Sequence, residues 1–178
     1  MLNLGIIILC PDGNLSGVSK TLISAQHNSY HRECMAIISD SADVKEMKGL
    51  CPVHRGRETI TSLINVGMHK LKQEWGLLVF AGSRFQHYFE RKLSIFVKSE
   101  YDVLFPVIGW NDGKMVFETA CFNGVLINKK FFEKIGDFPE DTEAYERLND
   151  FEMAKLFWCA AATQQGGIFK GVVGLQCG

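Results

Sequence analysis

The segment LNLGIIILC (residues 2–10) decides which fold to expect. Its apolar residues are consecutive rather than alternating and include a run of β-branched isoleucines, which is typical of a strand covered on both faces. PDGNLSG (residues 11–17) interrupts this run, and apolar residues return at helical spacing over residues 18–30, with Ser16 or Ser19 as the helix N-cap. A buried strand followed by a helix predicts an α/β fold.

The same alternation of strands and helices continues through the first half of the chain. CMAIISD (residues 34–40) is a second apolar run, and it ends at Asp40. Apolar residues then follow the 3.6-residue period of an amphipathic helix over residues 57–72. LLVF (residues 77–80) predicts the third strand, and a further helix is expected over residues 85–97. Repeated strand–helix units predict a parallel, doubly wound sheet with helices on both faces.

The second half of the chain has a different pattern. YDVLFPVIGW (residues 101–110) and KMVFETACF (residues 114–122) are extended segments around the turn signal NDGK, which predicts a hairpin or a mixed edge of the sheet. KKFFEKIGDF (residues 129–138) predicts a short helix that ends at a glycine. A helix over residues 149–161 and a strand over residues 167–176 complete the pattern. We therefore expect a three-layer α/β sandwich around a central, mostly parallel mixed sheet.

Length and composition indicate one ordinary globular domain over residues 1–178. The net charge of -1 gives no reason to expect binding to nucleic acid. No apolar run approaches the roughly 20 residues that cross a bilayer, so no transmembrane segment is expected. The six cysteines never have a Cys-x-x-Cys spacing, which favours unpaired thiols in a reducing, cytoplasmic compartment over a zinc site. The sequence does not determine the oligomeric state and is compatible with a homo-oligomer.

In the order of its segments, the chain resembles the glycosyltransferase family 2 domain, which has the GT-A fold. GIIILCPDGN (residues 5–14) looks like the first strand of that family with its proline-containing turn, and residues 21–43 look like the helix and strand that end in an aspartate facing the nucleotide. Residues 54–85 resemble the block that leads into the acidic metal-binding motif. CFNGVLINKKFFEKIGDFPED (residues 121–141) is similar to the family's glycine-containing strand and basic helix, and residues 149–158 resemble the helix that supplies the catalytic base.

The resemblance implies a glycosyltransferase of the hexosyltransferase type, which transfers a sugar from a nucleoside diphosphate sugar to an unknown acceptor. Residues 1–100 would form the nucleotide-binding half and residues 101–178 the acceptor-side half. The implied site residues are Asp150 as the catalytic base, Pro11, Asp12 and Asp40 at the nucleotide, and Trp110, Asn123 and Gly124 on the acceptor side. We expect the main pocket in the crevice where the strands end, above Pro11, Asp40 and Ser83.

The sequence departs from the family where the acidic motif is expected. Ala81, Gly82 and Ser83 stand there, and none of them has a carboxylate. Mg²⁺ and Mn²⁺ prefer carboxylate oxygens, so a divalent metal cofactor is not expected at this turn and no metal ligand is assigned.

Positive charge could replace the metal at this position. Arg84 follows the turn directly, and HRGR (residues 54–57) supplies Arg55 and Arg57 from the loop that precedes a predicted helix. Arginine side chains offer a planar fork of N–H donors to phosphate oxygens. A glycine at position 82 would let the backbone approach a diphosphate closely, with Ser83 beside it. The sequence therefore predicts a nucleotide site in which arginines take the place of the metal.

Each of these residues also has a simpler interpretation. Residues 81–83 could form an ordinary strand-to-helix turn with Ser83 as the N-cap, and the arginines could be solvated surface charges. Asp40 could make an Asx turn at its strand end, and Trp110 could cover a hairpin turn. Asp150 falls in the first turn of its predicted helix, where the macrodipole favours a carboxylate. For the whole protein, the alternative is a catalytically inactive GT-A-like binding or scaffolding protein.

Overall fold

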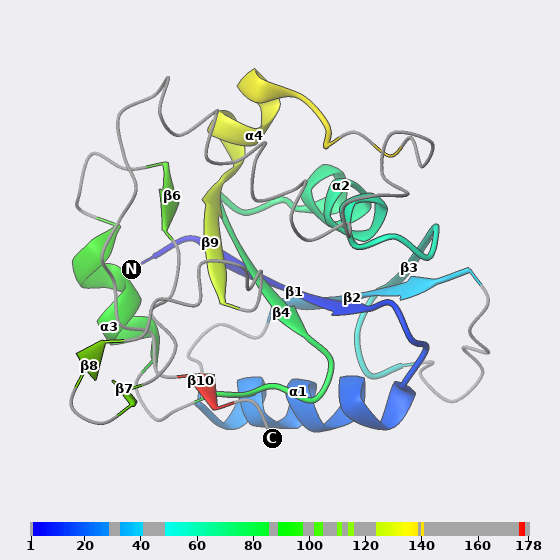
Figure 1. The fold of residues 1–178 in the computed structure, drawn as a ribbon, viewed down its shortest axis with the longest axis horizontal. Helices are drawn as coiled ribbons and strands as arrows, with labels where there is room; N and C mark the ends of the chain where they lie inside the picture. The colour runs from blue at the N-terminus through cyan, green and yellow to red at the C-terminus, as the bar shows by residue number, and fades with distance from the viewer. Residues whose placement is uncertain are drawn as a thin grey trace.

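A six-stranded sheet is the centre of the fold (Figure 1). The structure, a computed structural model, describes residues 2–28, 33–40, 49–85, 89–97, 102–104, 110–111, 114–115, 124–138, 140 and 175–176. The elements in chain order are β1 (Leu4–Cys10), α1 (Leu15–Asn28), β2 (Cys34–Ser39), β3 (Val53–Gly56), α2 (Ile60–Lys70), β4 (Trp75–Phe80), β5 (Arg84–Phe85), α3 (Phe89–Phe96), β6 (Val103–Leu104), β7 (Trp110–Asn111), β8 (Lys114–Met115), β9 (Val125–Asn128), α4 (Lys129–Ile135) and β10 (Leu175–Gln176). The strand order in the sheet is β3-β2-β1-β4-β9-β6.

The sheet is mixed and mostly parallel, as the sequence predicts. β1 pairs in parallel with β2 on one side and with β4 on the other, and β2 pairs in parallel with β3. β9 runs antiparallel to both of its neighbours, β4 and β6. The parallel part is therefore built from the first half of the chain, where strands and helices alternate, and the antiparallel part comes from the second half.

Helices cover both faces of the sheet, α1 and α3 on one face and α2 and α4 on the other (Figure 1). All seven residues of β1 are buried, because its side chains alternate between the two layers. The side chains on the α1 side are Leu4, Ile6, Ile8 and Cys10, and those on the α2 side are Ile7 and Leu9. This arrangement explains why the first strand is apolar at consecutive positions, and it confirms the predicted three-layer sandwich.

The helices begin and end at capping residues. α1 begins earlier than predicted, because the Asn14 side-chain oxygen accepts a hydrogen bond from the Gly17 amide at 3.0 Å. Asn14 therefore caps the helix, and the predicted caps Ser16 and Ser19 are wrong. Thr59 caps α2 by accepting from the Ser62 amide at 3.2 Å.

One strand and one helix start differ from the sequence-based expectation. β3 occupies residues that were expected to form a loop, because an edge strand of four residues with only Gly56 buried leaves no apolar pattern. The helix expected from residue 85 begins at Phe89 instead, and Arg84 and Phe85 form β5, which pairs antiparallel with β10. Ser83 therefore precedes a strand rather than a helix, so its interpretation as a helix N-cap is also wrong.

Several later expectations are confirmed in the described residues. β7 and β8 pair antiparallel as the predicted hairpin, and α4 ends at Gly136, whose φ of 84° is a conformation that glycine adopts readily. Leu175 and Gln176 of β10 lie within the predicted last strand. The helix expected over residues 149–161 lies outside the described residues. In the part of the chain that the structure describes, no helix has the length and apolarity to cross a membrane.

Candidate functional site

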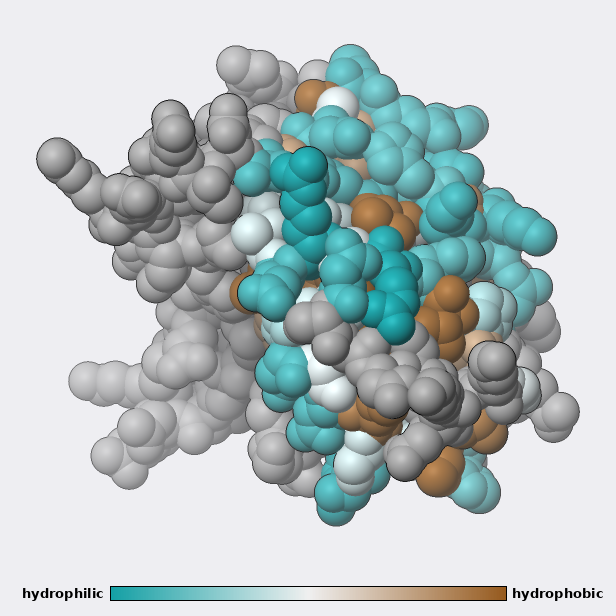
Figure 2. All heavy atoms as spheres, turned by 90° about the vertical axis from the view of Figure 1, so that its right-hand side faces the viewer, coloured by the Kyte–Doolittle hydropathy of each residue, from teal (hydrophilic) through white to brown (hydrophobic). Residues whose placement is uncertain are grey.

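The carboxyl ends of β1, β2 and β4 lie next to one another at one edge of the sheet. In the parallel register, Leu9 is opposite Ile37 of β2 and Phe80 of β4. Pro11, Asp40 and the turn after Phe80 therefore follow neighbouring strand ends, as the sequence predicts. This edge belongs to the side of the molecule seen in Figure 2, where hydrophilic residues dominate the described surface. The pocket expected there stays a prediction.

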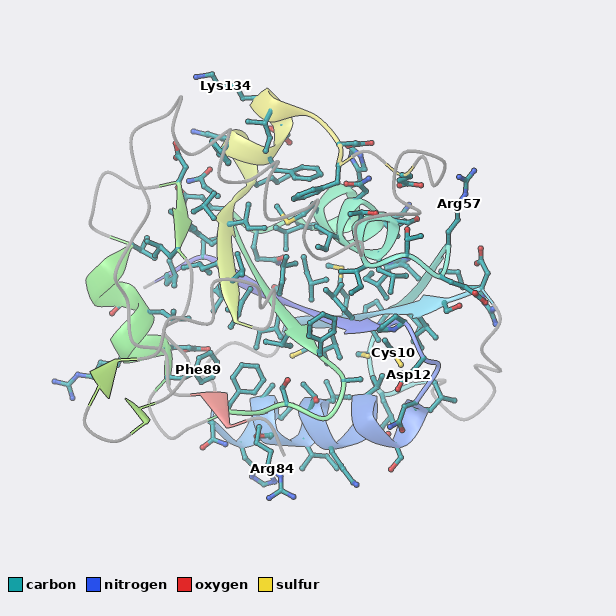
Figure 3. All side chains as sticks on the ribbon, in the orientation of Figure 1. Cys10, Asp12, Arg57, Arg84, Phe89 and Lys134 are labelled. Carbon is teal, nitrogen blue, oxygen red and sulfur yellow. The ribbon has the colours of Figure 1, made fainter. Side chains whose placement is uncertain are left out.

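The turn after β1 is held by Asp12. Its Oδ1 atom accepts hydrogen bonds from the Asn14 amide at 3.1 Å and from the Cys10 thiol at 3.6 Å. Burial, and secondly the negative charge of Asp12, raise the pKa of Cys10 to about 12, so Cys10 remains a neutral thiol that donates to the carboxylate. Asp12 itself is exposed, and its negative charge lies near the N-terminal end of α1 (Figure 3).

Asp40 and Arg55 are joined across the ends of β2 and β3. The guanidinium Nη1 of Arg55 donates to the carbonyl oxygen of Asp40, and the Asp40 amide donates to the Gly56 carbonyl at 2.9 Å. The Asp40 backbone is therefore fixed on the edge strand, and Asp40 and Arg55 are both exposed there. Arg55 lies in β3 and not in a loop as predicted, and Arg57 follows directly after the end of this strand.

The backbone of the turn after β4 is bonded within the protein. The Ala81 amide donates to Leu9 O at 2.8 Å, and the Ser83 amide donates to Phe80 O at 3.1 Å. The Gly82 amide lies 3.0 Å from Gly17 O and 2.9 Å from Thr21 Oγ1. These amides therefore offer a phosphate no unused N–H donor. A glycine is needed at position 82 because its φ is 97°, and the close approach of a diphosphate to this backbone stays a prediction.

Arg84 is separated from the other two arginines. After Gly82 the chain follows α1 toward its C-terminal end, since the Phe85 amide donates to Ser24 Oγ at 2.8 Å. Arg84 is exposed and projects beyond α1, whereas Arg57 lies on the far side of the sheet near α2 (Figure 3). The expectation that Arg55, Arg57 and Arg84 share one end of the sheet is therefore wrong for Arg84.

The residues predicted for acceptor binding and catalysis are only partly described. Gly124 directly precedes β9 and has φ 89°, and its amide donates to Leu78 O at 2.7 Å. Because β9 is antiparallel to β4, this end of β9 shares the edge at which β4 ends. Trp110 lies in β7, and Asn123 and Asp150 lie outside the described residues. Within the residues that are described, no group of three His, Cys, Asp or Glu side chains could hold a metal ion.

A set of contacts that the sequence does not predict attaches the segment after α4 to α2. The Asn65 side chain donates to Phe138 O and accepts from the Phe138 amide, both at 2.9 Å, and it also donates to Glu140 Oε1 at 2.9 Å. His69 Nε2 lies 2.7 Å from Asp137 Oδ1. The available signal was an asparagine within the apolar face of the predicted helix, since a buried amide requires partners. These contacts fix Asp137, Phe138 and Glu140 against α2.

No family model matches the sequence, and no curated protein matches it. Solved structures do match in fold. TarS of S. aureus is 13% identical with a TM-score of 0.62, and the match covers 88% of this chain and 34% of that one. TarS 1-349 in complex with UDP is 12% identical with a TM-score of 0.62, over 90% and 55% of the two chains. The mannosyltransferase PcManGT of Pyrobaculum calidifontis, in complex with GDP-Man and Mn2+, is 15% identical with a TM-score of 0.64, over 92% and 52%.

The chain therefore spans between about a third and just over half of the length of these solved structures. The likeness shows the fold: this chain has the GT-A-like fold of glycosyltransferases, as the order of its sequence segments predicts. The low identities agree with the departures seen in the sequence, in particular the turn after β4 that has no carboxylate.

Proposed function

We propose that this chain is a glycosyltransferase domain that transfers a hexosyl group from a nucleoside diphosphate sugar to an acceptor. The observation that carries the proposal is the joined pair of Asp40 and Arg55 at the ends of β2 and β3, next to Asp12 at the end of β1. In open α/β sheets ligands bind outside the carboxyl ends of the strands, where these residues lie. Structures with the same fold were solved with UDP, UDP-GlcNAc and GDP-Man.

The described residues at this edge suit the two halves of a nucleotide. The carboxylates of Asp40 and Asp12 can accept hydrogen bonds from N–H groups of the base or hydroxyl groups of the ribose. Arg57 and Arg55 can donate to diphosphate oxygens, which are stabilised most by charge-assisted contacts. Pro11 would border the base at the end of β1. The turn at residues 81–83 would close the other side of the site without donating from its backbone.

The chemical step is attack of an acceptor hydroxyl oxygen on the anomeric carbon of the donor. In this proposal Asp150 removes the hydroxyl proton, and the bond between the anomeric carbon and the diphosphate oxygen breaks. The leaving diphosphate gains negative charge, which arginine side chains can stabilise where it develops. Trp110, Asn123 and Gly124 would lie on the acceptor side.

A divalent metal does not fit the turn after β4. Mn²⁺ and Mg²⁺ require several oxygen ligands, usually carboxylates, and residues 81–83 offer at most a neutral hydroxyl. We therefore assign no step to a metal. The unpaired thiols of Cys10, Cys34 and Cys51 are consistent with a cytoplasmic location, which remains part of the proposal.

Calorimetric titration tests the proposal. UDP, GDP and their sugar conjugates are titrated into the protein with Mn²⁺ and with EDTA, and release of free nucleotide from each conjugate is followed separately. We expect one nucleotide to bind in EDTA and its sugar conjugate to be consumed when an acceptor or water is available. Binding without any turnover would instead identify a catalytically inactive binding protein. Failure of every nucleotide to bind would overturn the proposal.

A further inference from the structure

Two cysteines lie opposite each other where β2 and β3 begin. The parallel register places Ala36 opposite Val53, and the Ala36 amide donates to the Pro52 carbonyl at 3.0 Å. Cys34 begins β2 and Cys51 lies two residues before β3, so extending this register by two residues would place Cys34 opposite Cys51. Neighbouring strands are about 4.8 Å apart, and disulfides join Cα atoms that are about 4.4–6.8 Å apart. The backbone spacing therefore suits a bond between these two residues.

The two side chains also share one environment. Cys34 is 5% exposed and belongs to the apolar cluster between the sheet and α1, and Cys51 is half-buried and packs against the same cluster. Burial, and after it the neighbouring Cys51, raise the pKa of the Cys34 thiol to about 12. Burial also raises the pKa of Cys51. The thiols are thus close enough to interact electrostatically, and both are protonated and unpaired in the reduced protein.

Cys10 is the contrasting case. It is also a buried, unpaired cysteine at a strand end, but its sulfur donates to Asp12 Oδ1 at 3.6 Å. In the register of the sheet Cys10 is opposite Ile38 of β2, so no cysteine faces it there. Burial alone therefore does not make a pair, and the register of β2 with β3 distinguishes Cys34 and Cys51.

We propose that Cys34 and Cys51 form an oxidation site that closes into a disulfide between β2 and β3 when the protein meets hydrogen peroxide. Cys51 is the more exposed of the two, so the small fraction of it that loses its proton to solvent attacks the peroxide oxygen first and gives a sulfenic acid and hydroxide. The Cys34 sulfur then attacks the Cys51 sulfur. The S–S bond forms, and the sulfenic oxygen leaves as water with the Cys34 proton. One peroxide is reduced for each disulfide.

The disulfide would restrict β2, which Asp40 follows directly, and β3, which contains Arg55. It would close a loop from Cys34 to Cys51 that contains Asp40, and it would fix the start of β3, the edge strand on which Arg55 lies. A closed loop restricts the unfolded chain, so the oxidised protein should unfold at a higher temperature than the reduced protein. This inference concerns the cysteines alone and does not depend on which ligand the protein binds.

Peptide mapping of the folded full-length chain tests the inference. The reduced protein is treated with hydrogen peroxide and then denatured in the presence of iodoacetamide, which alkylates the remaining free thiols. The protein is digested, and the peptides are analysed by mass spectrometry with and without dithiothreitol. We expect one cross-linked species that joins the peptides of Cys34 and Cys51 and disappears on reduction. Cys10→Ser should leave it unchanged. Cys34→Ser should abolish it and leave a sulfenic acid on Cys51 that reacts with dimedone.

Two results would overturn the inference. One is the absence of this cross-link at peroxide concentrations that oxidise Cys51 further, to the sulfinic acid. The other is a cross-link from Cys34 or Cys51 to another cysteine of the folded chain. Each serine variant is compared with wild type by thermal unfolding, both in the reduced form, to establish that the variant is folded. The cross-link in the wild-type protein is tested independently of these variants.

Discussion

The amide nitrogen of Gly82 lies 3.0 Å from the carbonyl oxygen of Gly17, so the turn after β4 is bonded directly to the first turns of α1. The contact is between two backbones, and it requires that no side chain stand between them. A Cβ atom at position 17 would lie 3.1 Å from Gly82 N and 3.2 Å from the carbonyl carbon of Ala81. Glycine at position 17 therefore allows α1 to pack against this turn.

Gly17→Ala should destabilise the protein by about 1–3 kcal/mol, because neither backbone can move away without losing a hydrogen bond. At an ordinary helix position the same change would stabilise by up to about 1 kcal/mol, so the sign of the effect is diagnostic. Urea denaturation measures the difference. Ser16→Ala, at an exposed neighbouring position of α1, is the matched control and should have little effect. A stabilised Gly17→Ala variant would show that the turn does not pack as described.

The strand ends could be predicted from the sequence, but the hydrogen bonds of the turn could not. LLVF followed by small residues correctly predicts that β4 ends near Phe80. Besides Gly17 O, the Gly82 amide donates to Thr21, 61 residues earlier in the chain, and no local pattern indicates this contact. Likewise, Arg84 lies in β5, which pairs with β10 from near the C-terminal end of the sequence, and this pairing could not be predicted either. A glycine beside a strand end predicts a turn equally well whether or not a phosphate binds there.

The edge strand β3 shows a second limit of sequence patterns. Central strands such as β1 are buried on both faces and reveal themselves by consecutive apolar residues. β3 has a neighbour on one side only and contains His54 and Arg55, so its composition is that of a loop. The sequence therefore indicated Asp40 and Arg55 as candidate site residues, but it did not indicate that Arg55 lies in the strand β3, where it contacts Asp40.

Asn65→Ala should destabilise the protein by about 1–3 kcal/mol. Asn65 is 3% exposed, and its loss would remove the hydrogen bonds that it makes to the amide and the carbonyl of the buried Phe138. His69→Ala removes the contact with Asp137 in the same segment, but the side chains of His69 and Asp137 are 60% and 54% exposed, so it should cost no more than about 1 kcal/mol. Chemical denaturation of both variants makes the comparison. Equal losses would show that the Asn65 bonds do not anchor the segment.

The stability of the protein should fall as the pH falls below about 6.5, partly because of His54. Burial, and secondly Lys70, lower the pKa of His54 in the folded state from 6.5. The unfolded chain therefore binds a proton at a higher pH than the folded chain. The contribution of His54 is fully present above the unfolded pKa and is lost as the pH falls toward the folded one.

His54→Gln should consequently flatten the decrease of the unfolding temperature over the range from pH 6.5 down to the lowered pKa. Lys70→Gln removes only the second cause, so its slope should lie between those of His54→Gln and wild type. Thermal unfolding followed by circular dichroism at a series of pH values measures all three. A slope that is the same in His54→Gln and in wild type would contradict the assignment.

Nucleotide affinity should depend on Arg57 and not on Arg84, if the proposed function holds. Both arginines are exposed, and each substitution by alanine removes one positive charge, so the pair controls for net charge. Arg57 lies beyond the end of β3, near the edge that carries Asp40, whereas Arg84 projects beyond α1 (Figure 3). Loss of a charge-assisted hydrogen bond to a phosphate costs about 1.5–3 kcal/mol, which weakens binding by about ten- to hundredfold.

Calorimetric titration of the best-binding nucleotide should therefore show this loss for Arg57→Ala and an affinity within about twofold of wild type for Arg84→Ala. Because Arg84 projects beyond α1 and lies apart from Arg57 (Figure 3), only long-range attraction would link it to a nucleotide bound beside Arg57, and salt screens such attraction over about 10 Å. Repeating the titration at higher salt separates the two effects, since a direct contact of Arg57 should survive better than long-range attraction. A larger loss for Arg84→Ala than for Arg57→Ala would place the diphosphate beside β5 and would refute the site proposed at the ends of β2 and β3.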